Sequence, residues 1–163
     1  MPDNIKNKPR LYQTRFSFGA TSAIITILGL ISGLDMLARP KLTIIAGILV
    51  IALADNISDS VGIHIYQESE YINNKEVWIS TLTNFLTRLF VSLTFIMLVA
   101  FLPISLAVLS SIIWGLALLA AISYTIAKHR EVNPYLAISE HIGIAILVII
   151  ASHLIGRCII TRF

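Results

Sequence analysis

The chain of 163 residues is 56% hydrophobic and 13% charged, with a mean hydropathy of +0.85, whereas a soluble domain carries roughly 25% charged residues. This composition excludes a water-soluble globular domain. The basic residues ahead of the first apolar run indicate a membrane-surface anchor rather than nucleic-acid binding, and no stripe of basic and aromatic residues points to a nucleic-acid partner. The net charge is +3, and the single Cys158 excludes an intrachain disulfide and a thiolate metal cluster.

The first two apolar runs are each long enough to cross a bilayer, which takes about 20 residues at 1.5 Å per residue. Phe16 to Leu37 is predicted as the first span. It follows a basic segment but lacks a small-residue cleavage site, so we expect it to stay uncleaved. A short polar hinge at Arg39 to Lys41 leads to the second predicted span, Leu42 to Tyr66, and Gln67 to Lys75 is predicted as a polar loop.

Three further spans follow. Glu76 to Thr87 mixes apolar and polar residues, which fits a helical extension in front of the third span. The third, fourth and fifth spans are predicted at Phe85 to Leu102, Ser105 to Ala127 and Ala137 to Cys158. The sequence therefore predicts an all-α fold, a polytopic membrane bundle of about five transmembrane helices that occupies residues 1–163 as one domain.

The basic residues predict the orientation, because cytosolic loops carry an excess of Lys and Arg. With the N-terminus in the cytosol, that side collects Lys6, Lys8, Arg10, Arg15, Lys75, Lys128 and Arg130, against Arg39, Lys41, Arg157 and Arg162 on the other. We expect an integral membrane protein with a cytosolic N-terminus and an outer C-terminus, in the cytoplasmic membrane of a prokaryote or a vacuolar or organellar membrane of a eukaryote.

Two acids lie inside the second span. Asp55 and Asp59 are four residues apart and so share one helical face, with Asn56 and Ser60 beside them. A charged Asp at mid-membrane costs about 2.5 to 3.5 kcal/mol, so the pair must be protonated, paired, hydrated or bound to a cation. We expect a cation site, since intramembrane acids are functional by default; neutralisation by Arg88 or by hydroxyl groups is the structural alternative.

Depth counting relates these acids to the first span. Asp59 and Ser22 lie roughly 10 and 9 Å inside the cytosolic ends of their spans, and Asp55 and Thr26 roughly 16 and 15 Å inside. The two spans are therefore predicted to line one polar track. At its cytosolic mouth, imidazole and carboxylate groups of a kind that suits Fe, Mn or Zn end span two and begin span five, namely His64, Glu68, Glu70, Glu140 and His141.

Other polar and small residues have simpler readings. Arg88 is expected to snorkel toward the cytosolic interface, and His153 to be a satisfied packing residue rather than a ligand. Interfacial polarity is the alternative for Glu140 and His141. Gly29 and Gly33 let two helix backbones approach closely, either within one chain or between two copies.

The segment from Arg15 to Glu70, RFSFGATSAIITILGLISGL followed by AGILVIALADNISDSVGIHIYQESE, resembles the vacuolar iron transporter family, also called the CCC1-like family. FIMLVAFLPI and IGIAILVIIASHLIGR are similar to its third and last helices. The resemblance implies a five-helix homodimer that moves Fe²⁺, and sometimes Mn²⁺, out of the cytosol in exchange for protons. Its path would run between the first and second helices at the dimer interface.

Several family positions carry other residues here. On a gapless match the family's first-helix Asn and Asp fall at Thr21 and Ser22, its second-helix Met at Asn56 and its Glu at Ser60, with an acid at the neighbouring Asp59. The cytosolic metal-binding insert between the second and third helices is missing. The resemblance thus implies a metal site of Thr21, Ser22, Asp55, Asn56 and Asp59, which is rich in hard oxygen ligands.

The leading hypothesis is a proton-coupled exporter of Fe²⁺ or Mn²⁺, with Zn²⁺ as a further candidate and the metal as cargo rather than cofactor. Binding a dication would displace protons from Asp55 and Asp59, which supplies the coupling. The alternatives are a bundle that has lost the metal site and a transporter of another cation or small solute. No nucleophile with a base and no phosphate loop is present, so an enzyme is not expected.

Overall fold

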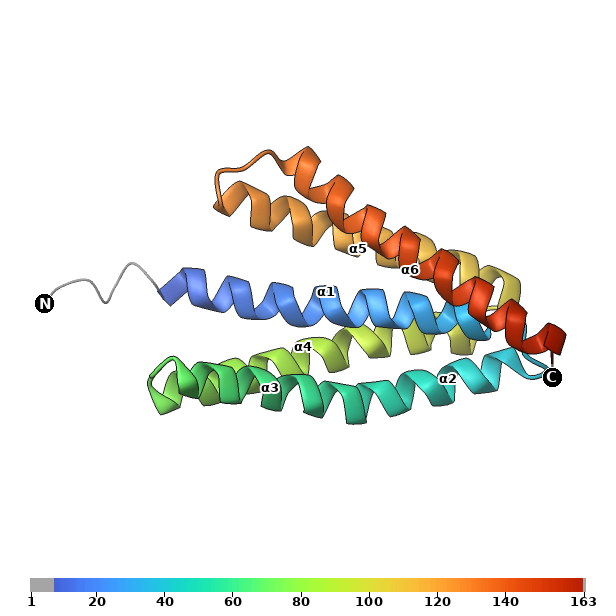
Figure 1. The fold of residues 1–163 in the computed structure, drawn as a ribbon, viewed down its shortest axis with the longest axis horizontal. Helices are drawn as coiled ribbons and strands as arrows, with labels where there is room; N and C mark the ends of the chain where they lie inside the picture. Colours follow the sequence, from blue (N-terminus) through green and yellow to red (C-terminus); the bar gives the residue numbers. More distant parts are fainter. Residues whose placement is uncertain (1–7, 163) are drawn as a thin grey trace, which may run out of the picture.

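The computed structural model describes residues 8–162, and it describes side chains from Phe18 onward. The described part of the chain is helical, without strands (Figure 1). Its elements are α1 (Lys8–Leu34), α2 (Pro40–Val50), the π-helical turn η1 (Ile51–Asp55), α3 (Asn56–Ser69), α4 (Asn74–Phe101), α5 (Ile104–His129) and α6 (Pro134–Arg162).

Four of the described helices are long and apolar enough to cross a membrane, and they suggest an integral membrane protein. They are the continuous run Pro40–Ser69, made of α2, η1 and α3, together with α4, α5 and α6. The apolar part of α1, Phe18–Leu34, is shorter. With it, the arrangement fits the expected five-helix bundle. The residues predicted as an extension of the third span belong to α4, which is one helix from Asn74 to Phe101.

Proline and asparagine mark where the helices begin. Pro40 opens α2 and Pro134 opens α6, positions where the missing N–H of proline removes no helical hydrogen bond. The Asn73 side chain accepts a hydrogen bond from the Lys75 N–H at 2.9 Å and so caps α4. The Asn133 side chain likewise accepts from the Tyr135 N–H at 3.0 Å in front of α6. These caps keep the connecting turns short.

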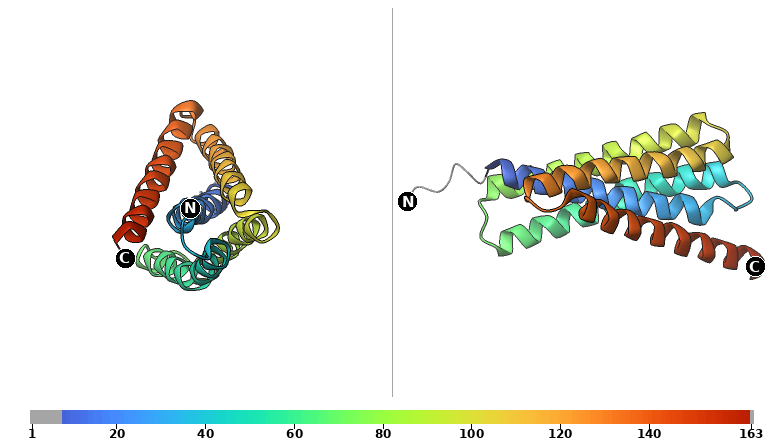
Figure 2. Two further views of the ribbon diagram at one scale, coloured as in Figure 1. Left: turned by 90° about the vertical axis from the view of Figure 1, so that its right-hand side faces the viewer. Right: turned by 90° about the horizontal axis from the view of Figure 1, so that it is seen from above.

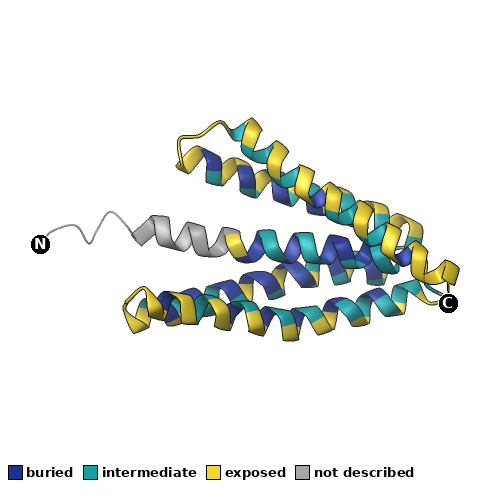
Figure 3. Ribbon diagram, in the orientation of Figure 1, coloured by how far each residue is buried: buried dark blue, intermediate teal, exposed yellow. Residues whose placement is uncertain are grey.

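Helix α1 lies in the middle of the bundle (Figure 2). It contacts α2, α4, α5 and α6. Its buried side chains Ile24, Ile27, Leu28 and Ile31 form the centre of the apolar core. The outer faces of the surrounding helices are largely exposed (Figure 3), and they carry many large apolar side chains, as a surface toward lipid tails would. The elements that hold Asp55, Asp59 and Arg88 therefore lie together on one side of α1, where α4 packs directly on α1 and α3 packs on α4.

Glycines bring α1 and α6 into close contact. A Cβ atom added at Gly156 would lie 2.2 Å from the Gly33 carbonyl oxygen, and one added at Gly29 would lie 2.9 Å from Val148. Gly33 itself faces Ser152. Of the two readings of Gly29 and Gly33, packing within one chain is therefore the one observed.

Candidate functional site

Asp55 and Asp59 lie where the second spanning helix changes its winding. Asp55 is the last residue of η1, and Asp59 is in the first turn of α3. The Asn56 N–H donates to the Ile51 carbonyl oxygen, five residues back. Single π-turns of this kind insert one extra residue into a helix and are frequent at functional sites. Asp55 thus ends the one stretch of Pro40–Ser69 that departs from α-helical winding, and Asp59 lies one turn beyond it.

Arg88 of α4 binds both acids. One terminal nitrogen of its guanidinium donates to Asp55 Oδ2 and the other to Asp59 Oδ2. The Arg88 side chain is 2% exposed, whereas those of Asp55 and Asp59 are 43% and 32% exposed. The prediction that Arg88 snorkels to the interface is wrong. Two carboxylates one helical turn apart match the two ends of a guanidinium, and these charge-assisted hydrogen bonds hold the cation inside the bundle.

Helix α1 reaches this ion-pair cluster through one hydroxyl group. Ser22 Oγ donates to Asp59 Oδ2 over 3.3 Å. Depth counting predicted that these two residues lie level, and this hydrogen bond confirms it. Thr21 and Thr26 lie half-buried on the same helix, and among the described contacts neither bonds to an acid. Of the polar track predicted between the first two spans, the described residues show one hydrogen bond, between Ser22 and Asp59.

A seam of polar side chains joins α3 to α4 on both sides of the cluster. The Asn56 amide group donates to the Phe85 carbonyl oxygen at 2.9 Å, and the Asn84 amide group donates to Ser60 Oγ at 3.1 Å. Asn56, Ser60, Asn84 and Arg88 are all at least 96% buried. Polar residues at spacings of three and four on both helices are the sequence signal for this seam.

Some polar atoms in the seam have no partner. Asn56 Oδ1, Asn84 Oδ1 and Arg88 Nε are buried and make no hydrogen bond among the described residues. Buried polar groups normally make hydrogen bonds, so each of these three atoms is an exception that needs a physical reason. Two of the three are oxygens of a type that can bind a cation.

His64 lies further along the same seam. Its Nδ1 is 3.0 Å from Thr81 Oγ1, and the Thr81 hydroxyl donates to the Val77 carbonyl oxygen at 2.9 Å. Thr81 thus links the His64 ring to the α4 backbone. Nε2 faces Glu68 Oε1 at 3.3 Å, and Glu70 is exposed at the end of α3.

The residues predicted for a common mouth lie on different sides of α1. Glu140 and His141 belong to the second turn of α6, which starts on the opposite side of α1 from the end of α3 (Figures 1 and 2). Glu140 is exposed, and His141 Nδ1 lies 2.7 Å from Ser123 Oγ on α5. In the part of the chain that the structure describes, no three His, Cys, Asp or Glu residues come together as a metal site.

His153 pairs with an acid at the other end of the bundle. Its Nδ1 lies 3.9 Å from Asp35 Oδ1, a loose ion pair between α6 and the end of α1. Among the basic residues used for the orientation, Lys6 lies outside the described residues. The side chains of Lys8, Arg10 and Arg15 also lie outside them.

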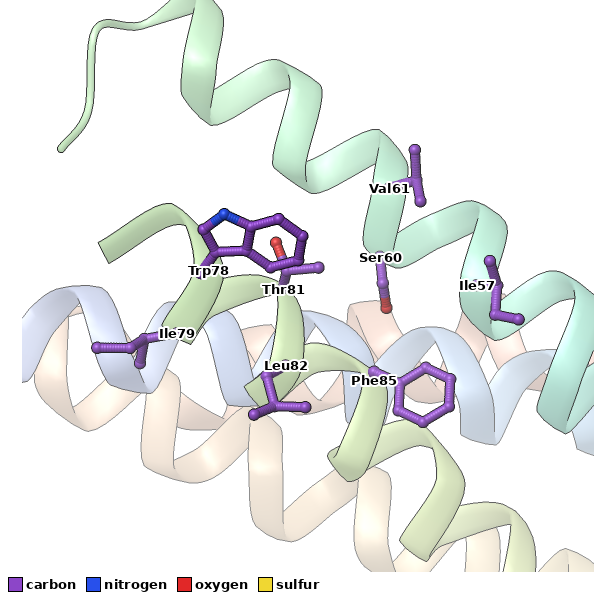
Figure 4. A pocket seen from close by; sticks show the side chains of 8 residues that line it. All are labelled: Ile57, Ser60, Val61, Trp78, Ile79, Thr81, Leu82 and Phe85. Carbon is purple, nitrogen blue, oxygen red and sulfur yellow. The ribbon is translucent and has the colours of Figure 1, made fainter. Parts of the chain in front are cut away.

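An apolar groove of about 380 Å³ lies between α3 and α4 (Figure 4). Ile57 and Val61 of α3 and Trp78 and Leu82 of α4 contribute to its walls, and no acidic residue lines it. Such a groove suits an apolar chain rather than an ion. The chemistry that the site offers to a cation therefore resides in Asp55 and Asp59, with Ser22 beside them.

No family model, curated protein or solved structure matches this chain. The resemblance to the vacuolar iron transporter family stays a prediction.

Proposed function

We propose that the protein is a membrane transporter of divalent transition-metal cations, Fe²⁺ or Mn²⁺, that leave the cytosol in exchange for protons. The observation that carries this proposal is the pair Asp55 and Asp59, two partly exposed carboxylates inside a spanning helix whose positive partner is a single buried arginine. One guanidinium leaves the two carboxylates with one uncompensated negative charge. A site of this charge attracts a further cation or a proton.

Charge balance favours a dication. When Arg88 withdraws, Asp55 and Asp59 present two negative charges one helical turn apart, which one divalent ion neutralises. Ser22 Oγ already bonds to Asp59 at 3.3 Å and could supply a third oxygen, and the unpartnered Asn56 Oδ1 is adjacent in the chain. Oxygen donors of this kind suit Mn²⁺ well and Fe²⁺ less selectively than a site with Met would.

Proton exchange follows from the same two carboxylates. A carboxylate that binds a metal must be deprotonated, so metal binding releases protons and proton binding releases the metal. Neither acid can stand charged and alone in the membrane, because each would cost about 2.5 to 3.5 kcal/mol. The metal cation, protons and Arg88 therefore take turns in neutralising Asp55 and Asp59. The homodimer and the N-in orientation are part of this proposal on the strength of the resemblance and of the loop charges.

The test is flux of Mn²⁺ and Fe²⁺ into proteoliposomes with an imposed pH gradient. The acid-free variant combines Asp55→Asn and Asp59→Asn with Arg88→Gln, so that no unpaired charge is buried. We expect its proton-driven uptake to fall to that of empty liposomes. Glu131→Gln, in the exposed turn before α6, is the matched control and should transport like the wild type. Unchanged uptake and pH dependence in the acid-free variant would show the mechanism to be wrong.

A second candidate is a bundle that does not transport. The observation in its favour is that Arg88 already binds both Asp55 and Asp59 and neutralises half of their charge. In that case the cluster is a structural cross-link between α3 and α4. The wild type would then transport no divalent or monovalent cation into proteoliposomes. The acid-free variant would fold with a stability similar to that of the wild type.

A further inference from the structure

Two unpartnered atoms on α4 suggest a second resting place for Arg88. Among the side chains that the structure describes, Arg88 Nε is a buried donor without a partner and Asn84 Oδ1 is a buried acceptor without a partner. The two residues are four positions apart on one helix, so their side chains lie on the same face. Side chains on an α-helix lean toward its N-terminus, which directs Arg88 toward Asn84.

The Asn84 side chain is held ready for such a contact. Its amide nitrogen donates to Ser60 Oγ at 3.1 Å, which fixes the plane of the amide and the direction of Oδ1. Gly19 of α1 packs against this oxygen, because a Cβ atom at Gly19 would lie only 2.5 Å from Asn84 Oδ1. The acceptor is therefore positioned by contacts from α1 and α3, and none of them involves Asp55 or Asp59.

We propose that Arg88 is a tethered cation with two positions, one on Asp55 and Asp59 when the site is empty and one on Asn84 when a divalent cation occupies the site. The proposal rests on the function given above, and it adds the residue that sets the selectivity. A monovalent ion brings no more charge than the guanidinium it must displace, and it lacks the two directed hydrogen bonds. A dication brings twice the charge. Arg88 therefore selects divalent over monovalent cations.

The first test measures Mn²⁺ binding to the purified full chain in lipid nanodiscs, with free Mn²⁺ read from its EPR signal. Arg88→Gln removes the competing charge, and we expect it to bind Mn²⁺ at least about tenfold more tightly than the wild type. NaCl should weaken binding more than choline chloride at equal ionic strength in Arg88→Gln, but not in the wild type. Arg88→Lys, which cannot span both acids, should change affinity in the same direction if Arg88→Gln fails to fold. Binding no tighter than wild type in the folded variants would overturn the proposal.

The second test addresses Asn84 by a double-mutant cycle, which isolates the coupling between two residues. Asn84→Ala should weaken Mn²⁺ binding several-fold in the wild type, because the displaced arginine loses its acceptor. It should have no effect in the Arg88→Gln background. Asn74→Ala, at the exposed start of α4, is the control and should leave binding unchanged. If Asn84→Ala weakened Mn²⁺ binding equally in both backgrounds, the second position of Arg88 on Asn84 would be overturned.

A third measurement needs no metal and separates this proposal from the transport function. Thermal unfolding midpoints are recorded for Arg88→Gln, Asn84→Ala and their combination, with the acids intact and in Asp55→Asn/Asp59→Asn. With the acids intact, we expect the shifts in midpoint caused by Arg88→Gln and Asn84→Ala to add in the combined variant. Without the acids, we expect the combined shift to differ from the sum by roughly 2–4 °C, because Arg88 then rests on Asn84. If no variant carries or binds metal but this coupling appears, the two positions of Arg88 stand and metal transport fails. Additive effects in both backgrounds would overturn the two positions.

Discussion

Arg88 is the least exposed charged side chain of the ion-pair cluster, and the two acids that hold it are the more exposed partners. This asymmetry matters energetically. Groups outside the bundle can reach part of Asp55 and Asp59, but the guanidinium depends on the protein for its hydrogen bonds. Removing the acids therefore harms the fold more than removing the whole cluster, because a lone buried charge is costlier than none.

A stability experiment can measure this dependence. Asp55→Asn/Asp59→Asn should lower the free energy of unfolding by about 3 kcal/mol, the low end for a broken buried pair, since the acids are partly exposed and Asn84 offers Arg88 another acceptor. Adding Arg88→Met should restore most of the loss, because no charge is then buried. Equilibrium unfolding by SDS in mixed micelles gives both values. A triple variant as unstable as the double variant would contradict this account.

At the residue level, the sequence predicted what helical geometry alone determines. Counting residues from the span ends placed Ser22 level with Asp59, and the two are hydrogen-bonded. The same counting could not tell which side of the second span faces α4, so pairing of the acids with Arg88 stood only as the alternative to a cation site. Arg88 lies close to the predicted start of the third span at Phe85, so it was expected to reach the interface. The packing of α3 against α4 instead places its side chain inside the bundle, on Asp55 and Asp59.

At the level of the helices, α1 and α6 approach each other closely at Gly33 and Gly156. Any side chain at Gly156 would meet the α1 backbone itself, which cannot move aside as a flexible side chain can. Such contacts gain stability from tight van der Waals packing, which is a main source of helix association in membranes. The pair therefore fixes both the distance and the rotation of α6 on α1.

We expect Gly156→Ala to destabilise the protein by about 1–3 kcal/mol, as overpacking typically does. The matched control is Gly143→Ala on the same helix, where an added Cβ meets no atom within 4 Å. That control should be neutral or gain up to about 1 kcal/mol from better helix propensity. SDS unfolding of both variants separates the two effects, and equal stability of the pair would refute the close contact.

The extent of each helix was largely predictable, because an apolar run of bilayer length has few other structures open to it. The turn η1 was not. Nothing in the hydropathy of Ile51–Asp55 marks an inserted residue, although the turn lies between two helices, α2 and α3, that both pack on α4. The start of α4 at Asn74 also lies well before the apolar run, because Asn73 caps it and α3 packs along it.

On the scale of the whole molecule, the α3–α4 turn and the α5–α6 turn lie at one end, and the C-terminal end of α6 lies at the other (Figure 1). Hydropathy marks spans but does not say which spans are neighbours. That is why His64 and Glu68 were grouped with Glu140 and His141, although α1 lies between their helices. Which helices pack side by side depends on their shapes and on small residues such as Gly33, and hydropathy contains no information about either.

Membrane orientation is testable with introduced cysteines. In a Cys158→Ala background, Ala38→Cys at the α1–α2 turn and Glu131→Cys at the α5–α6 turn lie at opposite ends of the bundle, and both positions are exposed. Because Lys75, Lys128 and Arg130 cluster at the second end, we expect a membrane-impermeant maleimide to label Ala38→Cys in intact cells and Glu131→Cys after permeabilisation. The reverse pattern would invert the orientation and, with it, the direction of export.

The central position of α1 also has a consequence for biosynthesis. A helix that enters the membrane early must wait for α4, α5 and finally α6 before its sides are covered, since these later segments all pack on it. Until then, Gly29 and Gly33 present a bare backbone to lipid or to the insertion machinery. Completion of the bundle is thus a late event that depends on the most distant segment of the chain. A ribosome that stalls before α6 would leave one face of α1 uncovered.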